Sequence, residues 1–178
     1  MTEDQDLERR RLAYRRAGLA VAHYTQGRPL SALSLRRPPG PGDEGPGHGR
    51  PVDLGSGARH RLELEVLAHW ASLLCEARAC LDDQEPAGGW GAAREPIADL
   101  GRRVTRSEEE NEAYLEWLRR RALGLIDLPG TWPAVEAVAG ALLAEGEIGG
   151  REATDLIAGV QRTRRHRSGI GDWFRGSR

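Results

Sequence analysis

Apolar positions recur every three or four residues along most of this chain, which is the pattern of helices that bury one face. The clearest apolar stripe runs through residues 58–82, with Trp70 at its middle. A first helix is predicted over residues 4–26, where Gly27 and Pro29 end it. The other stripes predict a short helix ending near 105, helices over 108–127 and 150–163, and one beginning beside Thr131. The pattern therefore predicts a compact, mainly α-helical fold of about six helices.

Local cap signals mark two of these helix starts. Ser107 is followed three residues later by Glu110, the spacing of a capping box, in which each side chain accepts from the other residue's backbone N–H. Thr131 can cap the next helix with its hydroxyl, and Pro133 fits the first turn, where its missing N–H costs nothing. The segment EGEIGG, which follows that helix, is predicted as a turn.

One segment carries a different period. Residues 30–37 alternate apolar and polar side chains, which predicts a short strand, with a second strand near 51–54 as its partner. Residues 38–50 between them are rich in proline and glycine and predict a flexible loop. The helical fold is thus expected to carry a small two-stranded β element.

Charge divides the chain into two unequal parts. The formal net charge is −1, but residues 162–178 hold six Arg against one Asp (+5), which leaves −6 on residues 1–161. We expect one helical domain over 1–161 and a disordered, Arg-rich tail over 162–178. The tail also holds Trp173 and Phe174, so contact with a partner or an anionic surface is the alternative; no nucleic-acid-reading fold accompanies it.

Cysteine usage and the absence of long apolar runs predict a cytoplasmic protein. Cys75 and Cys80 are five residues apart on one predicted helix, roughly 140° apart around its axis, so they are not expected to bond to each other. A reducing compartment is therefore favoured. We find no run of about 18 apolar residues and no apolar leader, and the absence of lysine is typical of a GC-rich bacterial genome.

Three separated segments align in order with one family. The segment YRRAGLAVAHYTQGRPLSALSLRR (14–37) resembles the peptidase domain of FtsH-type membrane zinc metalloproteases, where a His-Glu-Ala-Gly-His-Ala-Val helix runs into a turn and a strand. VLAHWASLLCEARA (66–79) is similar to the second long helix of that domain, and GALLAEGEIGGREATDLI (140–157) to its last helix pair. The resemblance covers most of residues 10–160 and implies a mainly helical peptidase-type domain.

The resemblance implies that this chain has lost the zinc ligands and the general base of the family. In the family, two His of the first motif and a later acidic residue hold zinc, and the Glu activates the bound water. In this chain the two His positions hold Arg15 and Leu19, and the Glu position holds Arg16. The later acidic ligand falls on Glu95, with Asp99 as the alternative.

The residues at these positions cannot support zinc-dependent hydrolysis. Zinc needs lone pairs from imidazole, thiolate or carboxylate, whereas Leu has none and Arg stays protonated with donors only. At about 5 Å and an effective dielectric near 20, each like-charge pair costs roughly 3 kcal/mol. Arg16 cannot accept a proton as a general base. No cofactor is therefore expected, and a chain without lysine has no Gly-x-x-x-x-Gly-Lys phosphate loop.

Several functions follow from this interpretation. Arg15, Leu19 and His23 are spaced i, i+4, i+8 on one helix face, so with Arg16 and Glu95 they form a candidate remodelled cleft. The first hypothesis is a catalytically inactive pseudoprotease that binds a protein partner through this cleft or the tail. The alternatives are an anionic small ligand held by Arg15 and Arg16, or a metallopeptidase with other ligands. The purely structural alternative is a solvated charged helix face that binds no ligand. In another version of it, Glu76 or Glu95 neutralises Arg15 or Arg16 within the fold.

Overall fold

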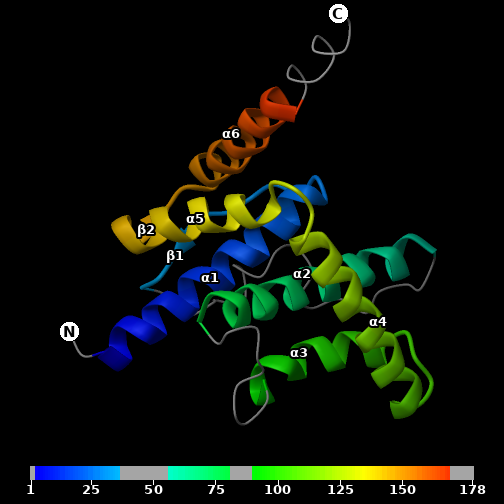
Figure 1. Ribbon diagram of the computed structural model, residues 1–178. Helices are drawn as coiled ribbons and strands as arrows, with labels where there is room; N and C mark the ends of the chain where they lie inside the picture. Colours follow the sequence, from blue (N-terminus) through cyan, green and yellow to red (C-terminus); the bar gives the residue numbers. More distant parts are fainter. Residues whose placement is uncertain (1–2, 37–55, 81–89, 169–178) are drawn as a thin grey trace, which may run out of the picture.

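The computed structural model describes residues 3–36, 56–80 and 90–168, and these form six helices and one pair of short strands (Figure 1). The prediction of a mainly α fold with a small β element is confirmed. The elements are α1 (Glu3–Thr25), β1 (Leu33–Ser34), α2 (Ser56–Cys80), α3 (Gly91–Arg102), α4 (Glu108–Ile126), α5 (Thr131–Glu145), β2 (Glu147–Ile148) and α6 (Gly150–Ser168).

Helices α1 and α2 form the centre of the fold and share its most extensive packing. Helix α5 packs on α1, and α6 packs on α5 and extends away from it (Figure 1). Helix α4 packs on α2, and α3 lies against both of them. Helix α1 therefore meets α5 and α2, whereas α3 and α4 contact the rest of the fold mainly through α2.

The central helix pair approaches closely because α1 presents small residues to α2. Ala13, Ala17 and Gly18 are buried on α1. A Cβ atom added to Gly18 would lie 2.8 Å from the Ala71 carbonyl oxygen and 2.8 Å from the Cys75 Cβ. Real Cβ atoms essentially never show such contacts, so only glycine allows this separation of the two backbones.

The structure has one of the two hydrogen bonds predicted for the capping box before α4. The Ser107 hydroxyl oxygen accepts a hydrogen bond from the Glu110 backbone N–H at 3.2 Å, as expected. The Glu110 carboxylate, however, accepts from the backbone N–H of Arg106 at 2.8 Å, one residue before the expected donor.

The predicted cap of α5 was wrong by one residue. Gly130 occupies the N-cap position with φ of 95°, in the left-handed region that glycine adopts at no steric cost. Thr131 is the first helical residue and is buried, and no side chain caps this helix. Gly130 follows Pro129 directly in a Leu-Pro-Gly sequence, which is a turn signal at the junction of α4 and α5.

The strand was predicted in the right region with a different partner. Strand β1 pairs antiparallel with β2, with Leu33 opposite Ile148 and Ser34 opposite Glu147. The predicted partner at 51–54 and the predicted loop at 38–50 lie outside the described residues. The EGEIGG segment therefore contains a short strand as well as a turn. Burial of the apolar Ile148 side chain stabilises the pairing of this strand with β1.

The last helix is longer than predicted. Helix α6 ends at Ser168 rather than at 163, so residues 162–168 continue the helix instead of starting a disordered tail. Arginine is a good helix former, and the first glycine after Gly159 is Gly169, so nothing in this stretch stops the helix. The tail with Trp173 and Phe174 lies outside the described residues.

Candidate functional site

Glu76 holds the arginine that occupies the predicted first zinc-ligand position. Its side chain is fully buried on α2, with 0% exposure. One carboxylate oxygen accepts a hydrogen bond from Arg11 Nε at 2.6 Å, and the other accepts from Arg15 Nε. Arg11 and Arg15 are one turn apart on α1, so both reach the same carboxylate. Of the two acids expected to neutralise Arg15, the structure selects Glu76.

This buried triad satisfies a strict electrostatic requirement. A carboxylate removed from water must be paired and hydrogen-bonded, because its desolvation is costly. Glu76 has a cation on each oxygen, and the hydrogen bond to Glu76 raises the pKa of Arg11 above its ordinary value. Arg11 also donates to Glu8 at 2.5 Å, at the exposed edge of the cluster. Arg15 thus serves to neutralise a buried acid in the α1–α2 interface.

The predicted cleft is divided between two cavities. Arg16, Leu19 and His23 line a cavity of about 120 Å³ that the segment 28–33 covers from the other side. Arg15 does not line this cavity and instead lines a larger one with Glu76. The two arginines at neighbouring positions therefore point into different spaces.

His23 is held as a neutral imidazole in the smaller cavity. It is 8% exposed, and within the described residues its Nε2 has no hydrogen-bond partner. Burial, followed by the nearby charge of Arg28, lowers the pKa of His23 to about 4, against a smaller opposing effect of Glu65. Arg28 is itself paired with Glu65 at 2.5 Å, and His69 Nε2 lies 3.8 Å from the same carboxylate.

Glu95 and Asp99, the candidates for the third zinc ligand, lie elsewhere. Both are exposed on α3, and both accept from Arg102 Nη1, at 3.0 Å and 2.7 Å. Helix α3 packs on α2 and α4, and neither acid lines the cavities that hold Arg15 and Arg16. The structure therefore brings Arg16, Leu19 and His23 together, and leaves Arg15 and Glu95 apart from them.

The residues at the predicted zinc positions do not fit a zinc ion. In the part of the chain that the structure describes, no three His, Cys, Asp or Glu side chains lie close enough together to hold a metal. Both cysteines are free, and burial raises the pKa of Cys75 to about 12 and that of Cys80 above its ordinary value. A protonated thiol is a poor metal ligand.

The larger cavity, of about 620 Å³, contains residues that the sequence did not single out. It lies between the N-terminal half of α1, the end of α5 and the residues after β1. We call it the arginine pocket, and its charged lining residues are Arg9, Arg11, Arg15, Arg36, Glu8, Glu76 and Glu145. The sequence signal that indicates this pocket is the i, i+4 spacing of Arg11 and Arg15, which places both arginines on one helix face.

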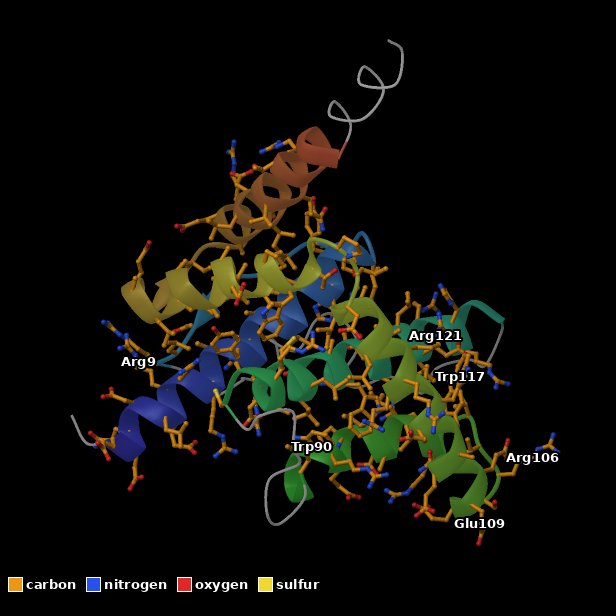
Figure 2. All side chains as sticks on the ribbon, viewed as in Figure 1. Arg9, Trp90, Arg106, Glu109, Trp117 and Arg121 are labelled. Atoms are coloured by element: carbon orange, nitrogen blue, oxygen red, sulfur yellow. The ribbon has the colours of Figure 1, made fainter. Side chains whose placement is uncertain are left out.

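A second unpredicted feature is an aromatic ladder on α4, formed by the half-buried Tyr114 and the exposed Trp117. Tyr114 and Trp117 stack with ring centroids 6.1 Å apart, and Arg121 lies 4.8 Å from the Trp117 ring. Arg59 of α2 lies over the other aromatic ring, that of Tyr114. Trp117 is 49% exposed. Figure 2 shows Trp117 and Arg121 on α4, at the opposite end of the view from Arg9 on α1.

Comparison with protein-family models, with curated proteins and with solved structures finds no match to this chain. The resemblance to the FtsH-type peptidase domain therefore stays a prediction made from its three segments. Among the described helices, none is long and apolar enough to cross a membrane.

Proposed function

We propose that this chain is a catalytically inactive module derived from an FtsH-type peptidase domain, and that it acts by binding a protein partner. The observation that carries the first half is the buried triad of Glu76, Arg11 and Arg15. At the position where the resemblance implies a zinc-binding histidine, this chain has a cation that neutralises a buried acid.

The chemistry at the neighbouring positions supports the same proposal. Arg16 carries donors only, so it cannot take a proton from water, and Leu19 offers no lone pair to a metal. Recruiting Glu76 as a metal ligand would leave Arg15 and Arg11 without their acid and beside a divalent cation. That arrangement is electrostatically unfavourable at any effective dielectric of a protein interior.

The aromatic ladder supports the second half of the proposal. Trp, Tyr and Arg are the residues that most often dominate binding energy at protein interfaces. Here Tyr114, Trp117 and Arg121 lie together on one helix face, and Trp117 exposes about half of its surface. A cytoplasmic location belongs to the proposal as well, and the two free cysteines support it.

Metal analysis separates this proposal from the alternative, a metallopeptidase with non-standard ligands. We expect the purified full chain to carry no stoichiometric zinc and to cleave no peptide from a diverse fluorogenic library. Zinc at one equivalent, together with peptide cleavage that a chelator abolishes and added zinc restores, would refute the pseudoprotease proposal.

Affinity purification after chemical cross-linking in bacterial cells tests the interaction surface. We expect a specific partner to be retained by the wild-type chain and lost with Trp117→Ala. Leu128→Ala is the matched control, because Leu128 is also a large exposed apolar residue, at 53%. Retention by Trp117→Ala and loss on deletion of residues 169–178 would assign the contact to the tail instead.

A further inference from the structure

We propose that the arginine pocket binds a small molecule that carries a phosphate group. The pocket shares Arg11, Arg15 and Glu76 with the buried triad, but phosphate binding does not depend on the proposed function, because it requires neither a peptidase ancestry nor the α4 surface. It also differs from the anion site expected from the sequence, which paired Arg15 with Arg16, since Arg16 lines the other cavity.

The size of the pocket suits a small ligand. Its volume of about 620 Å³ falls within the range of roughly 300–1,000 Å³ that small-molecule sites occupy. The smaller cavity, at about 120 Å³, is well below that range. Of these two cavities on α1, the arginine pocket is the one that can enclose more than a few water molecules.

The charges around the pocket favour an anion. Four arginines face three carboxylates, which gives a formal charge of +1. Glu76 is fully buried and already engaged by two guanidinium groups, so it repels an incoming anion less than a free carboxylate would. Glu8 and Glu145 lie at the exposed margin, where solvent and salt screen them.

Three of the arginines are held in place before any ligand arrives. Glu76 fixes Arg11 and Arg15 through their Nε atoms, and Arg9 Nη2 donates to the Leu143 carbonyl oxygen at 2.7 Å. The Leu143 bond also offsets the partial negative charge at the C-terminal end of α5. Guanidinium groups anchored in this way lose less conformational entropy when a ligand binds, which favours affinity.

The number and origin of the donors favour phosphate over a carboxylate. Each guanidinium has five N–H donors, and most of those in the pocket are not used by the hydrogen bonds described above. They come from two elements, α1 and the residues after β1, so they approach from different directions. A tetrahedral phosphate offers three oxygens to such donors, whereas a carboxylate accepts in one plane.

Arg36 provides the cleanest test, because the fold does not depend on it. Its side chain is exposed, and among the described residues it makes no side-chain hydrogen bond or ion pair. Isothermal titration of the full chain with glycerol 3-phosphate, at constant ionic strength, should give saturable binding, while glycerol should give none. We expect Arg36→Ala to weaken binding about tenfold, as for a lost hydrogen bond to a charged group. Arg120→Ala, which removes one positive charge on α4, should leave the affinity unchanged.

Three results would overturn the phosphate site. These are the absence of saturable binding to glycerol 3-phosphate, an equal loss of affinity with Arg36→Ala and Arg120→Ala, or binding of acetate as tight as that of inorganic phosphate. Zinc content and peptide cleavage have no bearing on these outcomes, so this site and the proposed function can fail separately.

Discussion

Two clusters of arginine and carboxylate have similar chemistry and opposite surroundings. In one, Glu76 is fully buried between Arg11 and Arg15. In the other, Arg102 lies on the surface of α3, within 3.3 Å of Glu108 and closer to Glu95 and Asp99. The first has one acid for two cations, and the second has one cation for three acids.

The difference between the clusters shows that the number of ion pairs does not determine how much a cluster contributes to the stability of the fold. The Glu76 carboxylate cannot reach water, so its partners are obligatory for the folded state. The Arg102 side chain is 43% exposed and its acids are more exposed still, so water replaces any partner that is lost. The three acids raise the pKa of Arg102, mainly through the hydrogen bond to Glu108, yet Arg102 is charged with or without them.

The largest effect is expected when Glu76 loses both of its partners. Replacing Arg11 and Arg15 together by Ala leaves a buried, unpaired carboxylate, which should lower the free energy of unfolding at pH 7 by about 3–5 kcal/mol. Urea denaturation followed by circular dichroism measures the loss. Adding Glu76→Leu to the double variant removes the buried charge and should recover most of the stability. A triple variant no more stable than the double would contradict the electrostatic explanation.

The second effect tests a buried group that has no ion pair, His23. Its pKa is about 4 in the folded chain and about 6.5 when unfolded, so the unfolded state binds more protons between these values. Stability should therefore fall as the pH drops below 6.5, by about 2 kcal/mol between pH 7 and 4.5. Chemical denaturation at both pH values should show this loss in the wild-type chain and not in His23→Leu. An identical loss in the variant would show that other groups cause it.

The helices could be predicted from sequence because their signals are local. Apolar residues at helical spacing located α1, α2 and α4 to within one or two residues, and Ser107 marked the start of α4. The pairing of β1 with β2 could not be predicted in the same way. Each strand has two residues, too few to show alternation, and Leu33 and Ile148 lie near opposite ends of the chain.

The site was predictable only as far as one helix determines it. Helical spacing placed Leu19 and His23 on one face, and both line the same cavity. It could not decide between Arg15 and Arg16, because long side chains on adjacent positions can reach in either direction. It also offered two acids for Arg15, and only the packing of α1 on α2 selects Glu76 over Glu95.

The third effect tests close packing that involves no charged group. It compares two helical glycines, one buried and one exposed. Gly18→Ala adds a Cβ against the backbone of α2, and the overpacking should outweigh the gain in helix propensity, for a net loss of about 1–2 kcal/mol. Gly124→Ala is the matched control, because nothing lies within 4 Å of its added Cβ and the substitution should stabilise α4 by up to about 1 kcal/mol. Denaturant midpoints give both values, and the same sign for both variants would contradict close packing at Gly18.

The smallest effect is expected for Arg102→Ala, although this arginine has more partners than either arginine of the buried triad. Its three acids stay hydrated when it is removed, so we expect no measurable change in the urea midpoint at 0.15 M salt. Lowering the salt concentration should reveal a small destabilisation, because the freed acids then repel one another over a longer range. A loss at 0.15 M salt comparable to that of the Arg11 and Arg15 double variant would mean that the number of ion pairs, and not burial, determines their contribution. The contrast between Glu76 and Arg102 would then no longer explain why the α1–α2 interface depends on its charges and the surface of α3 does not.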